Sequence, residues 1–301
     1  MLDVTKELKL VSGGNKGRFP YCNSLYIDDE IKCLIDTGCG QKTLVEIASS
    51  VDIVILSHYH PDHISGNSFF KDKPIYCHQA DVPPVEIKEA ILNYTGFIEI
   101  GEKEANAFLN SLNYHPAKVV GTFQEGDELD FGKTKLRVIH TPGHSPGHCC
   151  FYEEKKGILF SADIDLSSFG PWYGHNSCEI DAFEKSIKKI MDIEPKTIIS
   201  GHNGIVTENV NKRLLCYMDK IKERDKQILD FCSTPRTLKD IVDEKIIYGK
   251  HPEPRAVMLR LFEKKMIKKH LDRLFTRGEL KIDGPLYSKV KKFGNIFFAK
   301  A

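Results

Sequence analysis

Residues able to bind a metal ion gather in one short stretch: His58, His60, Asp62 and His63. They follow residues 51–56, an apolar run rich in β-branched side chains that is typical of a buried strand. His58 and His60 are two positions apart, so an extended backbone would direct both imidazoles to the same side. The proline that follows turns the chain and lets Asp62 and His63 face back toward them. Imidazole nitrogens and a carboxylate oxygen suit zinc, manganese or iron. The stretch therefore predicts a metal site rather than a histidine-rich surface loop.

Three later strands expected from the sequence also end at a side chain that can bind metal. Residues 136–141 lead to His144, residues 157–161 to Asp163, and residues 197–200 to His202. One histidine after a strand would be weak evidence for a metal site. A side chain that can bind metal at the end of four expected strands is much stronger evidence. A sandwich whose strand ends converge along one edge would bring these side chains together. Seven ligands that include one shared carboxylate suffice for two adjacent metal ions.

These residues resemble the metallo-β-lactamase-fold hydrolases, which are αββα sandwiches of the mixed α/β class. The family signature H-x-H-x-D-H stands at residues 58–63, and the aspartate at the end of the first strands is matched by Asp36. Later motifs match at Thr141-Pro-Gly-His144, Ser161-Ala-Asp163 and Ser200-Gly-His202. The resemblance covers about residues 1–210, which we expect to form the catalytic domain.

The resemblance also implies how the ligands are shared between two ions. One metal would be held by His58, His60 and His144, and the other by Asp62, His63 and His202. Asp163 would bridge the two. Histidine rather than glutamate at position 60, together with Asp62 and His63, favours the hydrolytic dinuclear site over the diiron flavoprotein variant. We expect two divalent ions, with zinc ahead of manganese or iron.

The expected chemistry is hydrolysis by a metal-bridging hydroxide. Two cations a few ångströms apart lower the pKa of a bridging water toward about 7 and polarise the oxygen of the substrate's carbonyl or phosphoryl group. Asp62 would orient the hydroxide or pass a proton to the leaving group, so Asp62 and Asp163 are the candidate catalytic residues. Esters, thioesters, amides and phosphodiesters all fit this reaction, and the fold does not choose among them.

Five further residues are candidates for supporting the site: Asp36, His148, Trp172, Tyr173 and His175. Asp36 either caps a helix or orients a metal-bound histidine through a hydrogen bond. The four-residue spacing of His148 from His144 would allow direct ligation or donation to the transition state, but we favour packing beneath the site. The other three lie in residues 165–176, which form either a packed surface loop or a rigid aromatic wall for substrate with Tyr173 or His175 as hydrogen-bond donor.

The composition is that of a globular protein, with 41% hydrophobic and 28% charged residues among 301. No apolar run reaches the roughly 20 residues that a membrane helix requires, and residues 1–8 lack the profile of a signal peptide. Nine cysteines are scattered without a C-x-x-C pair. We interpret them as reduced thiols of a cytoplasmic protein that has no membrane contact.

The C-terminal third differs chemically from the rest of the chain. Residues 212–301 carry 23 Lys and Arg against 12 Asp and Glu, whereas residues 1–211 carry 20 against 30. Helices followed by a hairpin at residues 279–290 resemble a winged helix, so we expect a small basic domain over residues 211–301. Such tails occur on the branch of metallo-β-lactamase-fold proteins of β-lactamase-like protein 2 type, which includes endoribonucleases. The lysines and arginines either bind nucleic-acid phosphates or form a solvated face on a module that packs on the catalytic domain and shapes its pocket. The second interpretation is favoured because we expect no interleaved exposed aromatics apart from Phe293, Phe297 and Phe298.

We therefore expect a metal-dependent hydrolase whose partner is a small-molecule ester, thioester or lactone, because the aromatic loop and the long segment 66–118 favour an enclosed pocket. The first alternative is an endoribonuclease acting on single-stranded RNA. An iron-dependent sulfur dioxygenase and a nucleic-acid-binding regulator with an inactive sensor domain rank lower, because the seven ligands are complete. A homo-oligomer is compatible with the sequence, which favours no particular oligomeric state.

Overall fold

The computed structural model of the protein describes residues 1–253 and 255–290. The chain forms two compact units, residues 1–220 and residues 221–301. They divide inside one helix, between Lys220 and Ile221, whereas the domain boundary expected from the sequence lies at residues 210 and 211. The aromatic residues Phe293, Phe297 and Phe298, noted above, lie outside the described residues.

The first sheet of the N-terminal unit is built entirely from residues 1–123. Its seven strands lie side by side in chain order, from β1 to β7. They are β1 (Leu2–Asp3), β2 (Leu8–Val11), β3 (Ser24–Ile27), β4 (Cys33–Ile35), β5 (Ile53–Ile55), β6 (Ile75–His78) and β7 (Gly121–Phe123). β1 to β4 pair antiparallel, and β4 to β7 pair parallel. The carboxyl ends of β4 and β5 therefore lie at the same edge of the sheet.

The second sheet uses only residues 128–206. Its order is β13-β12-β11-β10-β9-β8. The strands are β8 (Glu128–Asp130), β9 (Lys135–His140), β10 (Cys149–Glu153), β11 (Ile158–Ala162), β12 (Thr197–Ser200) and β13 (Gly204–Val206). β11 and β12 pair parallel, so the residues that follow them, Asp163 and Gly201, leave the sheet at one edge. The sheets pack through a core to which both contribute, with Leu25 and Ile35 from one and Phe151 and Phe160 from the other.

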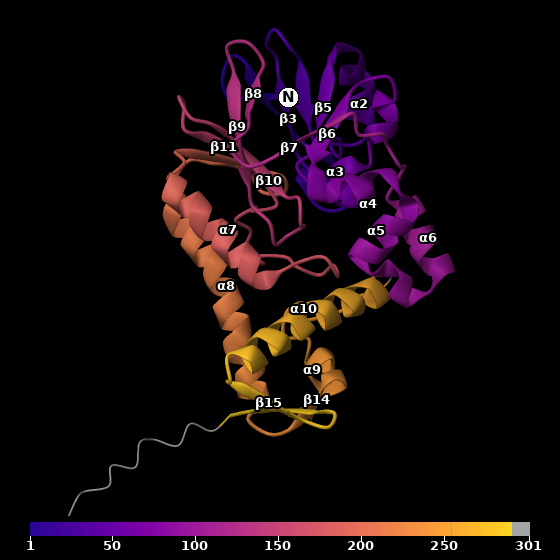
Figure 1. The fold of residues 1–301 in the computed structure, drawn as a ribbon, viewed down its shortest axis with the longest axis vertical. Coiled ribbons are helices and arrows are strands. Elements are labelled where there is room, and N and C mark those ends of the chain that lie inside the picture. The colour runs from indigo at the N-terminus through magenta and orange to yellow at the C-terminus, as the bar shows by residue number, and fades with distance from the viewer. Residues whose placement is uncertain (254, 291–301) are drawn as a thin grey trace, which may run out of the picture. The chain divides into compact units, whose positions relative to one another are not determined.

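Helices cover the outer sides of the two sheets. The first half of the unit contains the short α1 (Gly14–Gly17), α2 (Gln41–Ile47), α3 (Pro61–Ile64), α4 (Val82–Glu86), α5 (Lys88–Thr95) and α6 (Glu102–Ser111), with 3-10 turns η1 (Ala48–Ser50), η2 (Asn67–Phe70), η3 (Gln79–Asp81) and η4 (Phe97–Ile100). The second half adds α7 (Ile180–Ile193) and α8 (Val210–Phe231). α7 buries Phe183, Ile187 and Ile190 on one side, and it runs beside the first part of α8 (Figure 1), where the Asn211 amide donates to the carbonyl of Met191.

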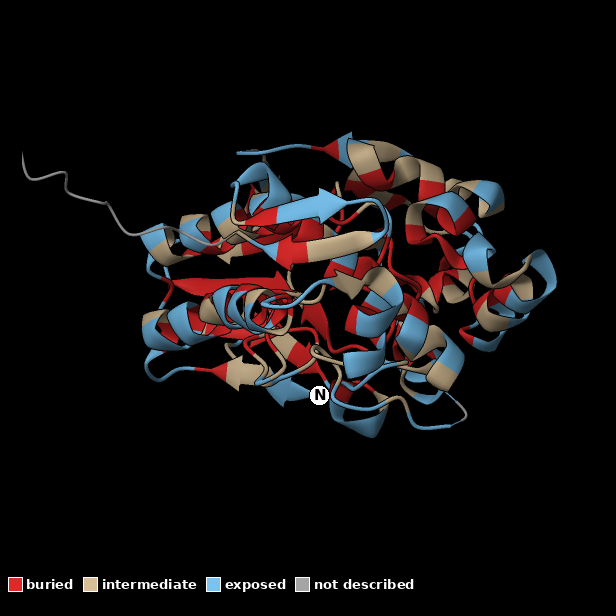
Figure 2. Cartoon of the chain, turned by 90° about the horizontal axis from the view of Figure 1, so that it is seen from below, coloured by how far each residue is buried: buried red, intermediate tan, exposed pale blue. Residues whose placement is uncertain are grey.

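Burial follows this layering. In Figure 2 the strands of the N-terminal unit are mostly buried, and the helices turn their exposed sides to solvent. Two sheets that pack face to face with helices outside form the αββα sandwich expected from the resemblance. The mixed α/β fold class is thereby confirmed.

The C-terminal unit contains the end of α8, then β14 (Arg236–Thr237), α9 (Leu238–Glu244), α10 (Ala256–Thr276), β15 (Leu280–Asp283) and β16 (Leu286–Lys289). The three strands form one sheet in the order β14-β16-β15. A capping box between Thr237 and Asp240 begins α9. The hydrophobic core of this unit includes Ile228, Ile241 and Leu271. The hairpin after the helices is present at the expected residues, and its assignment as a winged helix stays a prediction.

No helix in the described parts of the chain is both long and apolar enough to cross a membrane.

Candidate metal centre

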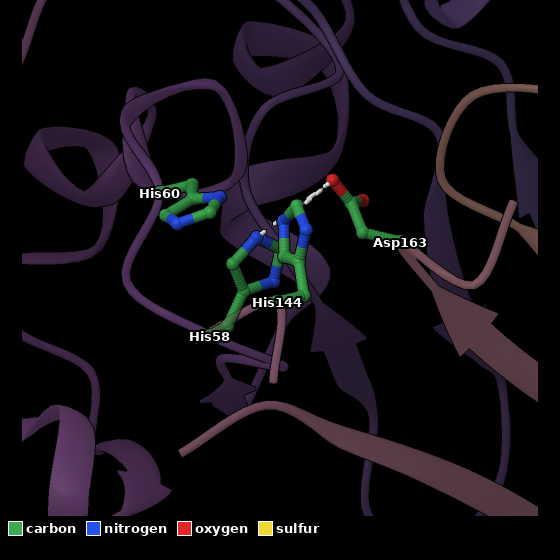
Figure 3. Close-up of side chains that lie close together, drawn as sticks. All are labelled: His58, His60, His144 and Asp163. Carbon is green, nitrogen blue, oxygen red and sulfur yellow. Dashed lines mark ion pairs between the residues drawn. The ribbon is translucent and has the colours of Figure 1, made fainter. Parts of the chain in front are cut away.

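Side chains from the ends of both sheets meet in two adjoining groups. Ligand atoms of His58, His60, His144 and Asp163 all lie within 4.8 Å of one another, as do those of Asp62, His63 and His202. Figure 3 shows the first group, with the imidazoles gathered on one side of the Asp163 carboxylate. The fold thus brings together all seven residues that the sequence singled out as ligands.

Asp163 lies between the two groups. Its Oδ2 is 2.9 Å from His144 Nε2 and 4.0 Å from His58 Nε2. Its Oδ1 is 2.8 Å from His63 Nε2 and 3.3 Å from His202 Nε2. Each oxygen of one carboxylate therefore faces a different set of imidazoles, which is the arrangement required of a ligand that bridges two cations.

Several atoms that face the centre are buried and form no hydrogen bond of ordinary geometry, although each lies within ion-pair distance of another side chain. They are His58 Nε2, His144 Nε2 and Asp163 Oδ1. Leaving a buried polar atom unsatisfied costs roughly 1–3 kcal/mol, more for a charged group. Divalent cations would satisfy these atoms, and five imidazoles with two carboxylates form a donor set suited to zinc, manganese or iron. The residues present fit a dinuclear metal site.

Histidines that bind metal through one nitrogen usually have the other nitrogen fixed by a hydrogen bond. Here His58 Nδ1 lies 2.9 Å from Ser57 Oγ, and His63 Nδ1 lies 2.8 Å from Asp36 Oδ2. Asp36 is fully buried and also accepts hydrogen bonds from the backbone nitrogen and the hydroxyl of Ser57, both at 2.7 Å. One carboxylate therefore orients two imidazoles: that of His63 directly, and that of His58 through Ser57.

Two backbone carbonyls fix another pair of imidazoles. His144 Nδ1 donates to the carbonyl of Trp172 at 2.9 Å, and His202 Nδ1 donates to the carbonyl of Gly17 at 2.6 Å. Both bonds leave Nε2 facing the centre. Burial lowers the pKa of His202, but the carboxylates of Asp163 and Asp62 outweigh it and raise that pKa to about 10. The position therefore favours a positive charge, carried by a proton or by a metal ion.

His60 is held differently. Its Nε2 lies 2.9 Å from Nδ1 of His175, so Nδ1 is the nitrogen left for a metal. Burial, together with the nearby His144 and His175, lowers the pKa of His60 well below its usual range. Between two neutral imidazoles one nitrogen donates and the other accepts, and only donation by His60 Nε2 leaves its Nδ1 with a lone pair for ligation.

His148 supports Asp163 from beneath. Its Nε2 accepts a hydrogen bond from the backbone nitrogen of Asp163 at 3.2 Å, so Nδ1 carries the proton and donates to Thr141 Oγ1 at 2.8 Å. Burial and the neighbouring His144 lower the pKa of His148 to about 3, which keeps the ring neutral. In this structure His148 touches the backbone of a candidate ligand and belongs to neither ligand group.

The aromatic loop of residues 165–176 is divided between packing and support. Tyr173 is fully buried and Trp172 is half-buried. The ring of His175 packs edge-on against Trp172, with centroids 4.7 Å apart, and against Phe97, at 5.2 Å. The loop thus supplies hydrogen-bond partners to His60 and His144, a connection that the sequence pattern did not reveal.

Asp81 is a further residue that sequence reasoning missed. Its buried carboxylate accepts hydrogen bonds from the backbone nitrogens of Tyr59 at 3.1 Å and Gly147 at 2.7 Å, and from Ser145 Oγ at 2.7 Å. It therefore joins the loop that carries His58 and His60 to the loop that carries His144. Burial raises the pKa of Asp81 to about 6, against the opposing effect of these bonds. No motif marks Asp81, because its partners are mostly backbone groups.

A buried cysteine lies beside the second group. Ligand atoms of Cys22, Asp36 and His63 lie within 4.8 Å of one another. Burial raises the pKa of Cys22 to about 12 in the absence of a metal ion. Asp36, the carboxylate of this cluster, is already engaged by His63 and Ser57, so we do not count Cys22 among the candidate ligands.

Comparison with known proteins agrees with this site. The family model of the metallo-beta-lactamase superfamily matches residues 17–202, which is more than half of the chain. The chain belongs to that superfamily, as the resemblance implied.

Individual relatives extend the likeness beyond the sandwich. A beta-lactamase-like protein 2 homolog of Drosophila melanogaster is 26% identical over 275 residues, covering 83% of this chain and 80% of its own. An atrochrysone carboxyl ACP thioesterase of Pseudocercospora fijiensis is 24% identical over 289 residues, covering 88% and 75%. The fold is shared by a metallo-beta-lactamase family protein of Thermus thermophilus, whose crystal structure matches with a TM-score of 0.76 at 22% identity, covering 96% of this chain and all of that one. Metal-dependent hydrolysis is the activity that this family and this site define.

Proposed function

We propose that this protein hydrolyses a thioester at a dinuclear zinc centre, within the wider class of small esters, thioesters and lactones. The observation that carries the proposal is the position of Asp163, with one oxygen toward each group of imidazoles. Five histidines with their outer nitrogens already engaged hold the rest of the centre. The thioester is favoured among acyl substrates because one relative spanning most of the chain is named a thioesterase.

The chain's own groups support acyl transfer to water. Two bound cations would lower the pKa of a water molecule and polarise the substrate carbonyl. The side chain of Asp62 is 11% exposed, and its Oδ2 lies 3.5 Å from His202 Nε2. It therefore borders the centre and can take up a proton as water adds to the carbonyl carbon. The carbon–sulfur bond then breaks, and the proton is returned to the thiolate. The products are a carboxylic acid and a thiol.

A thioester assay with released thiol as the readout tests this proposal. We expect zinc-replete protein to cleave an acyl-N-acetylcysteamine thioester, and Asp163→Ala to lose at least roughly 10²-fold in kcat/KM. His115→Ala is the matched control, because His115 is an exposed histidine outside both ligand groups. Equal activity in the wild type and Asp163→Ala would reject the assignment of the centre. Cleavage that requires manganese or iron instead of zinc would reject only the choice of metal.

A second candidate, cleavage of single-stranded RNA, is favoured by the charge of the C-terminal third. Residues 212–301 carry 23 basic against 12 acidic side chains. Lysines and arginines that bind phosphates release counterions, so binding weakens steeply with salt. Metal-dependent cleavage of a labelled RNA that is lost in Asp163→Ala and falls with salt would support this function. Cleavage equal to that of Asp163→Ala would reject it.

A further inference from the structure

A groove of about 370 Å³ lies within the N-terminal unit, outside the two ligand groups. One wall is the segment Leu166–Ser168, just after Asp163, and the other is the start of α8 with Asn209 before it. Three cationic side chains line it: Lys212, Arg213 and Lys220. Among the described residues that line the groove, none is acidic.

The cations at the mouth of the groove are not neutralised by the protein itself. Lys212 and Arg213 are exposed, and neither forms an ion pair with any residue that the structure describes. Other exposed lysines of the same unit do pair, such as Lys188 with Glu184 at 3.0 Å. Hydroxyls of Ser167 and Ser168 and the amide of Asn209 add neutral hydrogen-bond donors. Ammonium, guanidinium and hydroxyl donors around one hollow are the groups that bind a phosphate.

Both walls of the groove adjoin the backbone of Asp163, a candidate metal ligand. Tyr217 lines it, and the Tyr217 hydroxyl donates to the backbone carbonyl of Asp163 at 2.9 Å. The opposite wall is continuous with Asp163 through Ile164 and Asp165. From Lys212 to Lys220 the helix rises about 12 Å, which is long enough for an extended substrate arm to lie along it.

We propose that this groove binds the phosphate of a phosphopantetheine arm, so that the substrate is the thioester of a phosphate-bearing thiol carrier. The identity of the carrier rests on the proposed thioesterase function, whereas phosphate binding does not. Lys212 and Arg213 contact the phosphate, and the pantetheine chain leads the thioester toward Asp163. The same phosphate is present in coenzyme A and in the prosthetic group of an acyl carrier protein.

Binding of products separates the groove from catalysis. In calorimetric titrations of the zinc-replete wild type, we expect 4′-phosphopantetheine to bind at least roughly 10-fold more tightly than pantetheine, which has the same thiol arm without the phosphate. The double variant Lys212→Ala/Arg213→Ala should lose that preference, and the charge-preserving Lys212→Arg/Arg213→Lys should keep it. The control Lys42→Ala/Lys71→Ala removes two exposed lysines that line no part of the groove. Equal affinity for 4′-phosphopantetheine and pantetheine in the wild type would overturn the proposal.

Kinetics with matched thioesters identify the carrier. For acetyl-coenzyme A and for an acetylated carrier protein, we expect the Lys212→Ala/Arg213→Ala variant to raise KM at least roughly 10-fold for the carrier that uses the groove, with kcat unchanged. KM for acetyl-N-acetylcysteamine should not change. If KM is unaffected for both carriers, the groove proposal fails while the thioesterase function stands. If no thioester is cleaved at all, the function fails, and the titrations still decide whether the groove binds phosphate.

Discussion

The hydrogen bond between His60 and His175 determines which nitrogen of His60 faces the candidate metal centre. His175 Nδ1 lies 2.9 Å from His60 Nε2, and the Tyr59 hydroxyl is 3.4 Å from the same nitrogen of His175. Of the five candidate ligand histidines, four are oriented through Nδ1, and His60 is oriented through Nε2. His175 is therefore a positioning residue, which acts on a metal through His60.

Two substitutions of His175 distinguish the position of the acceptor from the mere presence of a polar side chain. In His175→Asn the amide oxygen takes the place of Nδ1, whereas in His175→Gln the amide lies where Nε2 was. We expect His175→Asn to keep near wild-type metal affinity and His175→Gln to lose roughly 10–100-fold. Competition with a chromophoric chelator measures this affinity independently of activity. Equal affinities of the two variants would contradict the positioning role.

Asp81 allows a test of linkage between pH and stability. Burial raises the folded-state pKa of its carboxyl from 3.8 to about 6, so the folded state holds this proton more tightly than the unfolded state. The stabilising contribution is therefore present below about pH 4 and is lost as pH rises through about 6. We expect Asp81→Asn to lower the free energy of unfolding by about 1–3 kcal/mol at about pH 5, because one of three buried donors loses its acceptor. The loss should be smaller at about pH 7.5. Urea unfolding of metal-free protein at both values measures the difference. A cost that grows with pH would show that the bonds, and not burial, dominate.

At the scale of elements, the turn between β4 and α2 is where backbone packing sets the position of α3. A Cβ on Gly38 would overlap the carbonyl oxygen of Asp62. Only glycine lets the turn after Asp36 approach helix α3, which carries Asp62, this closely.

Substitution of Gly38 should therefore disturb the fold and the second ligand group together. We expect Gly38→Ala to lower the free energy of unfolding by about 3 kcal/mol or more. The control Gly126→Ala has positive φ, but a Cβ added there would have no atom within 4 Å, so this variant should cost only about 1 kcal/mol. Denaturant titration together with metal content per chain measures both effects. A similar small loss in both variants would show that the loops can separate without harm.

The elements differ in how well their sequences reveal them. The sequence predicts β5, β9, β11 and β12 within a residue or two, because each is a short apolar run that ends at a polar, chemically distinctive residue. It does not predict the opening strands β1 and β2, nor β13. β2 reads Leu8-Lys-Leu-Val11 between polar residues and is too short to stand out, while β13 begins at a glycine with φ of +71°. Their pairing with neighbouring strands, not their own composition, makes them strands.

In the candidate metal centre, too, residues in compact local motifs could be predicted, whereas contacts between residues far apart in the sequence could not. The cluster of candidate ligands could be predicted, since each follows a strand and the motifs are compact. Of the groups that orient them, the sequence indicated Asp36. The backbone partners could not be predicted, because the carbonyl of Gly17 lies 185 residues from His202, and a carbonyl leaves no mark in a sequence. His175 was among the candidates only as part of an aromatic loop, and its partner lies 115 residues away.

At the scale of the whole molecule, metal ions should contribute to stability as well as to chemistry. A ligand that binds only the folded state stabilises it by about 2.7 kcal/mol at about 100 times its Kd. For a unit of this size we expect removal of metal by a chelator to lower Tm by roughly 5–10 °C, and zinc to restore it. Calorimetry with and without chelator measures the shift, and Asp163→Ala should show a smaller one. An unchanged Tm after complete loss of metal would mean that the centre is rigid without its ions.

The division of the sheets along the chain has a consequence for how the two halves are joined. Residues 1–123 supply one sheet with His58, His60, Asp62 and His63, and residues 128–206 supply the other with His144, Asp163 and His202. Neither half alone has a complete ligand set for either metal ion, and the connection between them at residues 124–126 is an exposed turn. The centre thus adds a metal-dependent link to the hydrophobic core that the two halves share. A chain cut at that turn should reassemble more tightly with zinc than with a chelator, so that the association of the pair would be controlled by metal.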